Sequence, residues 1–122
     1  MIATSTKDNI DLSNSVMILG TEYKIIQSRD DEDSNLIDVD AYVDSSVKKI
    51  VVNTRMMEGA TIGEPIMYYK KVMRHEIIHA FLEESGLSVQ AKWDESHNEQ
   101  MVDWVAIQFP KMMEVFKKLN LL

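Results

Sequence analysis

The chain has 122 residues, about the size of one ordinary domain, and its 45% apolar and 27% charged residues are typical of a soluble globular protein. It contains no cysteine, so disulfides, thiolate nucleophiles and cysteine-ligated zinc are excluded, and any metal must be held by nitrogen and oxygen ligands. Twenty acidic against 13 basic residues give a formal net charge of -7, which argues against nucleic acid as a partner.

The N-terminal segment, residues 1–8, lacks the apolar stretch of a secretory signal peptide. No segment of the sequence approaches the roughly 18 consecutive apolar residues that cross a bilayer. The sequence therefore predicts a cytoplasmic protein that makes no use of a membrane.

Three strands are predicted in the first half of the chain. Residues 22–27 form the first, which ends at the acidic run 30–33. This run lacks the glycine and the distal glutamate of a calcium-binding loop, so we interpret it as a solvated loop. Residues 36–43 alternate apolar and polar side chains, the period of a half-buried strand. Residues 47–52 follow a turn signal and are expected to form a hairpin with residues 36–43.

Three helices are predicted in the second half. The first lies between Pro65, which suits the first position of a helix, and Gly86, which suits a left-handed C-terminal cap. The second opens at residues 94–96. Proline lacks the amide hydrogen that a helix interior requires, so Pro110 is expected to stop or kink this helix. Residues 111–119 are expected to form a short third helix.

The order of elements, strands in about residues 1–55 and helices in about residues 64–122, argues for a single α+β domain. Residues 55–63 are predicted as the loop between the two halves. The expected architecture is a small antiparallel sheet of about three strands, followed by two long helices and a short C-terminal helix that pack on one face of it.

The pentad His75-Glu76-Ile77-Ile78-His79, which lies inside the first predicted helix, indicates a metal-binding site. Residues four apart share one face of a helix, so His75 and His79 can both reach one zinc ion at about 2.0–2.1 Å. Glu76 lies roughly 100° around the helix, where it can act on a water beside the ion as a general base rather than as a ligand. The alternative is a pair of core histidines satisfied by hydrogen bonds.

A catalytic zinc site also needs a third protein ligand and one open position. Glu99, on the second predicted helix, is the candidate, and Asp103 shares its face and can accept a hydrogen bond from a ligand imidazole. The stretch from Ser96 to Glu99 is also a capping-box pattern, in which Glu99 would instead bond the start of the helix. His97 is the rival ligand, although it points to another side of that helix.

The pentad, followed on the next helix by Asn98-Glu99-x-x-x-Asp103, resembles the gluzincin branch of zinc metallopeptidases. Residues 75–86 and 98–110 also resemble the compact ImmA/IrrE-type and SprT-like metallopeptidases and the small proteases of phages and prophages of Gram-positive bacteria. The metzincin branch is excluded, because it needs a glycine and a histidine where Leu82 and Ser85 stand.

The resemblance implies a minimal zincin fold and a zinc-dependent endopeptidase with one Zn²⁺ per chain. The implied ligands are His75, His79 and Glu99, with Glu76 as the base and Asp103 as the carboxylate that orients a ligand.

The family also supplies a Tyr or His that stabilises the oxyanion. No position here matches that pattern, and the unranked candidates are His97, Tyr68, Tyr69, Tyr42 and Tyr23. An extended protein or peptide substrate would add to the sheet edge, for which residues 47–52 are the candidate strand.

Two alternatives from other classes stay open: a zinc-bound but non-catalytic binding or regulatory protein of a phage or mobile element, and an interaction domain without metal. Trp93 and Trp104 are interpreted as packing residues, with Trp104 buried on several sides. Met112, Val115 and Leu119 give the last predicted helix an apolar stripe that packs on the core or serves a dimer.

Overall fold

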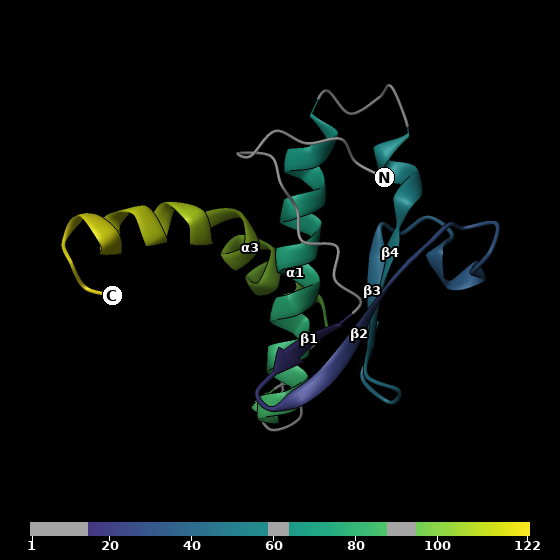
Figure 1. Cartoon of the computed structure of the whole chain (residues 1–122), viewed down its shortest axis with the longest axis horizontal. Helices are drawn as coiled ribbons and strands as arrows, with labels where there is room; N and C mark the ends of the chain where they lie inside the picture. The colour runs from purple at the N-terminus through teal and green to yellow at the C-terminus, as the bar shows by residue number, and fades with distance from the viewer. Residues whose placement is uncertain (1–14, 59–63, 88–94) are drawn as a thin grey trace.

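The computed structural model describes residues 15–58, 64–87 and 95–122, the last range with its side chains from residue 99 onward. These residues form a small sheet, two short 3₁₀ turns and two long helices (Figure 1), which confirms the predicted α+β class. The signal-peptide prediction for residues 1–8, the glycines of the loop at 59–63 and the packing of Trp93 lie outside the described residues. No helix in the described part of the chain is long and apolar enough to cross a membrane.

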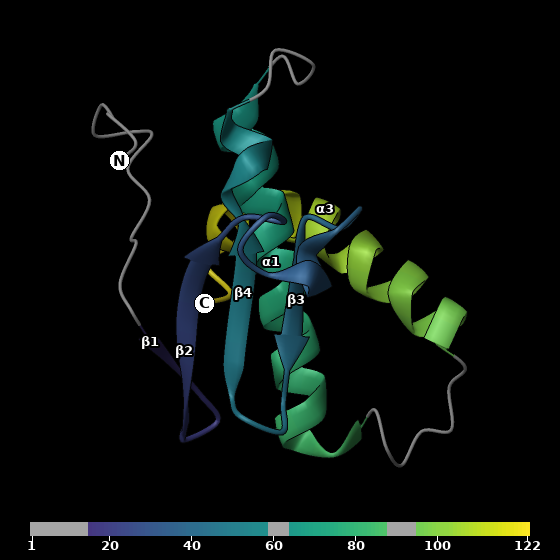
Figure 2. The same ribbon diagram turned by 90° about the vertical axis from the view of Figure 1, so that its right-hand side faces the viewer.

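The sheet has four strands in the order β1-β2-β4-β3. Their bounds are β1 Ser15–Ile18, β2 Thr21–Ser28, β3 Ala41–Asp44 and β4 Lys49–Asn53. The β1–β2 and β3–β4 pairs are antiparallel, but β2 and β4 run parallel (Figure 2). The expected all-antiparallel sheet of three strands is therefore wrong.

β4 lies between two other strands, and its residues Ile50 to Asn53 are all buried. A strand that is buried along its length, rather than on alternate residues, belongs in the middle of a sheet. The hairpin from β3 to β4, with Ala41 opposite Val52, was predicted and is confirmed. The strand β1 was not predicted; it joins β2 through a tight turn in which Leu19 and Gly20 both have positive φ, as type I′ hairpin turns require.

Only the end of the predicted strand 36–43 is extended. Residues Ser34–Leu36 form a 3₁₀ turn, and Asp38 adopts a left-handed backbone with φ of 63°. The side chain of Asn53 donates hydrogen bonds to the carbonyls of Leu36 and Val39, at 3.4 and 3.1 Å. These bonds hold the backbone of a loop, in which Leu36 is buried, that the alternating sequence pattern alone assigned to a strand.

Helix α1, Pro65–Ser85, packs across one face of the sheet. It begins with Pro65 in its first turn and ends at Gly86, whose φ of 79° makes the predicted left-handed cap. Tyr69, Val72 and Ala80 of this helix are buried against Tyr23, Ile50 and Val52 of the sheet in a single core cluster.

Helix α3, Glu95–Lys118, is continuous through Pro110, so the predicted short third helix at 111–119 is wrong. Pro110 has no amide hydrogen to donate to the carbonyl of Ala106. This carbonyl instead accepts a hydrogen bond from Nε of Arg74 at 2.7 Å. This outside donor offsets part of what the proline costs the helix.

The two halves of α3 differ in burial. Val102 and Ala106 are fully buried, whereas the C-terminal half extends away from the rest of the molecule (Figure 1). Trp104 is 58% exposed, and Val115 and Leu119 are also exposed. The predicted burial of Trp104 on several sides and the packing of the C-terminal stripe on the core are therefore wrong.

Candidate metal centre

The site lies where α3 crosses α1. One face of α1 packs on the sheet, and another face is turned toward α3. One face carries Tyr69, Val72 and Ala80 to the sheet. The other carries His75 and His79, one helical turn apart, to α3. Since the core residues fix the rotation of α1 on the sheet, the histidines are presented to α3 by the same packing that makes the fold.

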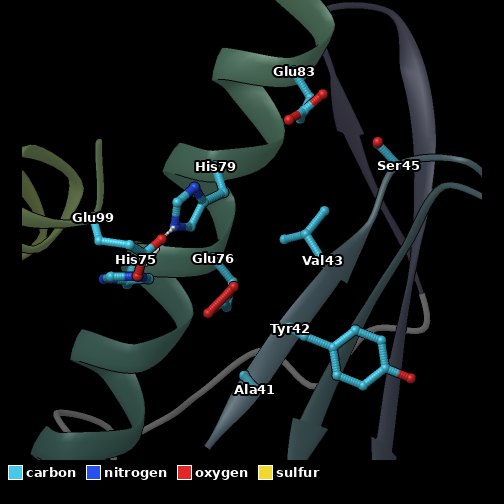
Figure 3. A pocket seen from close by; sticks show the side chains of 9 residues that line it. All are labelled: Ala41, Tyr42, Val43, Ser45, His75, Glu76, His79, Glu83 and Glu99. Atoms are coloured by element: carbon cyan, nitrogen blue, oxygen red, sulfur yellow. Dashed lines mark hydrogen bonds and ion pairs between the residues drawn. The ribbon is translucent and has the colours of Figure 1, made fainter. Parts of the chain in front are cut away.

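Three side chains converge at this crossing: His75, His79 and Glu99. The Nε2 atoms of His75 and His79 lie 3.2 Å apart. The Glu99 carboxylate reaches both rings, with Oε1 2.5 Å from Nε2 of His79 and Oε2 3.3 Å from Nε2 of His75 (Figure 3). The position of Glu99 favours the ligand interpretation over the capping box, because its carboxylate lies at the histidines.

This geometry fits a small cation with nitrogen and oxygen ligands. Ligand atoms placed tetrahedrally at about 2.0–2.1 Å from zinc lie about 3.3 Å from one another. The Nε2–Nε2 distance of 3.2 Å and the 3.3 Å between Oε2 of Glu99 and Nε2 of His75 are close to this value, whereas the 2.5 Å between Oε1 of Glu99 and Nε2 of His79 is shorter. One ligand atom from each of the three residues lies within 4.8 Å of the other two. Two imidazoles and one carboxylate that leave a position open are the ligand set of catalytic zinc sites.

Asp103, one turn beyond Glu99, lies on the far side of the His75 ring. Its Oδ1 atom is 3.3 Å from Nδ1 of His75 and 3.6 Å from Nζ of Lys71. A carboxylate at Nδ1 favours the tautomer with the proton on that nitrogen, which leaves the lone pair of Nε2 directed at the cluster. The structure therefore places Asp103 where it can orient a ligand.

Glu76 leaves the metal-facing side of α1 and points toward β3 (Figure 3). It is only 8% exposed, and no positively charged partner accompanies it among the described residues. Burial raises the pKa of Glu76 to about 7, and the negative charges of Glu99 and Asp40 add to the rise. A carboxyl group with a pKa near 7 can both take up and release a proton at neutral pH.

Two cavities meet at these residues. The first, about 330 Å³, runs between α1 and the edge strand and is lined by Ala41, Val43 and Ser45 together with Glu76 and Glu83. The second, about 270 Å³, lies on the other side of Glu76. Asp40, Tyr68 and Lys71 line the second cavity but not the first. Both cavities reach His75, Glu76 and Glu99, so together they form a cleft that passes over the candidate metal centre.

The structure separates the candidates for oxyanion stabilisation. Tyr69 is 2% exposed and lies in the core. The hydroxyl of Tyr23 donates to Glu84 and that of Tyr42 donates to Asp33, both at 2.6 Å and both away from the cluster. Tyr68 lines the second cavity, with its hydroxyl donating to Asp40, and is the tyrosine that remains.

The side chain of His97 lies outside the described residues, so its role as rival ligand or substrate contact stays a prediction. The cluster of His75, His79 and Glu99 forms without it.

The strand beside the cleft is β3, and the prediction that residues 47–52 form the accessible edge is wrong. β4 is paired on both sides, with β2 and with β3, whereas β3 has one partner, β4, among the strands that the structure describes. Sequence reasoning also missed Asp40 and Glu83 as cleft residues. A signal for Glu83 was available, since it follows His79 by one helical turn; none pointed to Asp40.

Comparison with known proteins gives no relative. No protein-family model, no curated protein and no solved structure matches the chain.

Proposed function

We propose that the protein is a zinc-dependent metallopeptidase of the gluzincin type, with a minimal zincin fold. The observation that carries the proposal is the meeting of three ligand atoms from two helices beside a buried carboxyl group, at the floor of a cleft next to a sheet edge. His75, His79 and Glu99 would hold one Zn²⁺, and Asp103 would fix the ring of His75.

Zinc held by His75, His79 and Glu99 would supply the Lewis acidity of the reaction, because zinc lowers the pKa of a bound water toward about 7 and polarises a carbonyl group. The carboxylate of Glu76 takes a proton from the attacking water and passes it to the nitrogen of the leaving amine. Glu76 is buried beside the cluster without a positively charged partner among the described residues, so no ion pair has to be broken before it takes up the proton. Tyr68 is the candidate donor to the developing oxyanion, for which its hydroxyl would have to exchange its hydrogen bond to Asp40 for one to the substrate.

An extended peptide or protein is the substrate that this cleft supports best. Among the described strands β3 pairs only with β4, and its other edge borders the first cavity, where an added strand would pair with it. The carboxylate of Glu83 points into the same cavity (Figure 3), and neither lysine nor arginine is among its described lining residues. We infer a preference for a basic side chain at the position of the substrate that reaches Glu83.

The proposal is tested by metal content and by cleavage. Protein purified without added metal or a histidine tag is expected to contain one zinc per chain, measured by elemental analysis. A peptide library read by mass spectrometry is expected to show new termini with the wild type. Glu76→Gln is expected to keep the zinc and lower the cleavage rate by about 10²–10⁴ or more.

Glu114→Gln, the same chemical change at an exposed position of α3, is the matched control and is expected to cleave normally. Equal cleavage by wild type and Glu76→Gln would contradict the proposal. Zinc bound without cleavage by either protein would favour the zinc-bound regulatory protein instead.

A further inference from the structure

Pro110 leaves one backbone acceptor of α3 without its normal partner. In an α-helix the carbonyl of residue i accepts from the amide of residue i+4, so the carbonyl of Ala106 would accept from position 110. Proline has no amide hydrogen to give. Ala106 is fully buried, and a buried carbonyl without a donor is costly because water cannot replace the lost bond.

Arg74 of α1 supplies the donor, with its Nε 2.7 Å from the Ala106 carbonyl oxygen. Among the described residues this is the hydrogen bond that Arg74 makes, and no carboxylate there forms an ion pair with it. Burial lowers the pKa of the Arg74 guanidinium, a sign that the charge is partly desolvated. A partly buried arginine is thus directed at one carbonyl of the neighbouring helix.

The place of this bond connects it with the metal centre. Arg74 directly precedes His75, and Ala106 lies about one turn beyond Asp103 and two turns beyond Glu99. We propose that Arg74 is a positioning residue: its bond to the carbonyl that Pro110 leaves unpaired fixes where α3 lies along α1, and thereby holds the carboxylates of α3 at the two histidines. The inference rests on the proposed metal centre for its functional consequence.

The proline makes the bond selective for one arrangement. With an ordinary residue at position 110, the Ala106 carbonyl would be satisfied inside α3 wherever that helix lay on α1. With Pro110 it is satisfied only where Arg74 meets it. A displacement of α3 that moves the Ala106 carbonyl away from Arg74 and keeps it buried therefore leaves an acceptor unpaired, which is a penalty against that other position of Glu99.

Zinc affinity in a double-mutant cycle tests the proposal. Arg74→Met keeps the aliphatic stem but removes the donor, and is expected to weaken zinc binding about tenfold. Pro110→Ala restores an amide at position 110 and is expected to bind zinc like the wild type. In Arg74→Met/Pro110→Ala the Ala106 carbonyl is satisfied again within α3, so most of the affinity is expected to return. If Arg74→Met caused the same loss with and without Pro110→Ala, the inference would be overturned, as it would by unchanged affinity in Arg74→Met.

Tyr23→Phe is the control that distinguishes a specific effect on zinc affinity from a general loss of stability. It removes a hydrogen bond between α1 and the sheet and leaves α3 untouched. This variant is expected to melt earlier with zinc affinity unchanged. Arg74→Lys, which keeps a donor on a flexible stem, is expected to lie between wild type and Arg74→Met, and it carries the test if Arg74→Met does not fold.

A measurement on metal-free protein keeps this inference distinct from the proposed function. The chain has no cysteine, so Met67→Cys and Lys118→Cys give two selective sites for spin labels, one on each helix. Arg74→Met is expected to broaden the distance distribution between the labels, and adding Pro110→Ala to narrow it again. If the wild type binds no zinc, the metallopeptidase proposal fails and the inference is decided by these distances. An unchanged distribution in Arg74→Met overturns it.

Discussion

Two polar clusters lie along α1, and they differ in how their hydrogen-bonding groups are satisfied. Near the C-terminal end, the carboxylate of Glu84 accepts hydrogen bonds from Thr21, Tyr23 and Lys48 at 3.1, 2.6 and 2.6 Å. Halfway along the helix, a carboxylate and two imidazole nitrogens crowd together at 2.5–3.3 Å. In the first cluster, three donors serve one carboxylate. In the second, if both imidazoles are neutral, the lone pairs of the two Nε2 atoms and the Glu99 carboxylate outnumber the hydrogens that lie between them.

The difference distinguishes a cluster whose hydrogen bonds are complete from the cluster that we propose as a metal site. A carboxylate with three donors has its bonds complete and fastens the helix to the sheet. A proton on Nε2 of His79 would satisfy one contact of the second cluster, whereas a cation held by both imidazoles and the carboxylate would satisfy all three lone pairs together. The predictions below separate the two clusters, beginning with the largest effect.

Removal of zinc is expected to destabilise the protein strongly. A ligand that binds only the folded state contributes about 4 kcal/mol when its free concentration is a thousandfold above its Kd. Since the proposed ligands come from both α1 and α3, chelation should lower the melting temperature by on the order of 10–15 °C. Calorimetry before and after chelation measures this shift. An unchanged melting curve after verified metal removal would mean that the centre does not couple the two helices.

Glu99→Gln and Glu84→Gln make the same chemical change in the two clusters. About 10–16 kcal/mol of binding energy shared among four zinc ligands gives roughly 10²–10³ in affinity for each. Glu99→Gln should lose about that much, because glutamine is a poor ligand. Glu84→Gln should keep wild-type affinity and lower only the stability. Zinc affinity is measured by competition with a chelating dye; a wild-type value in Glu99→Gln would restore the capping-box interpretation.

Helix α1 and the positions of Glu99 and Asp103 are the parts of the fold and of the candidate site that could be predicted from the sequence. The bounds of α1, at Pro65 and Gly86, and the shared face of His75 and His79 follow from local rules of helix capping and periodicity, and the structure confirms them. The spacing of Glu99 and Asp103 on a second helix predicted that both could reach the histidines, and the structure brings them there.

The parts that sequence reasoning missed depend on distant contacts. The parallel pairing of β2 with β4, which leaves β3 at the edge, joins segments that are about 25 residues apart in the chain. The continuation of α3 through Pro110 depends on a donor from another helix, Arg74. The three partners of Glu84 come from β2 and from the turn before β4, far from Glu84 in the chain. No local pattern carries this information.

Asp103→Asn tests the support of the ligand His75. Loss of a carboxylate that orients a metal-binding histidine typically costs about 10- to 100-fold in metal affinity. The same loss is expected here, because Oδ1 of Asp103 lies 3.3 Å from Nδ1 of His75. Lys71→Met removes the other partner of Asp103, a partly exposed ion pair at 3.6 Å, and should leave zinc affinity nearly unchanged. Similar losses in both variants would assign the effect to local charge rather than to orientation of the ring.

Tyr23→Phe probes the satisfied cluster. Tyr23 is fully buried, and burial together with the adjacent Glu84 raises the pKa of its hydroxyl, so it stays a donor at neutral pH. Removing it deletes one charge-assisted bond but leaves Glu84 with two other donors. The expected cost is about 1–2 kcal/mol of unfolding free energy, measured by urea denaturation. Weakened zinc binding in this variant would contradict the separation of the two clusters.

Glu83→Gln should have the smallest effect, and it is confined to substrate choice. Glu83 and Glu84 are neighbours in sequence, yet Glu84 turns to the sheet and its three donors while Glu83 points into the cleft. Among the described residues no lysine or arginine forms an ion pair with Glu83, so its charge is available to a substrate. Because Glu83 is exposed, an ion pair there is worth little, and kcat/KM for peptides with a lysine near the scissile bond should fall only about two- to fivefold.

Peptides with alanine at that position are the control and should be cleaved equally by both proteins. An equal fall for both peptides would mean that Glu83 acts on the metal centre next to it and not on the substrate.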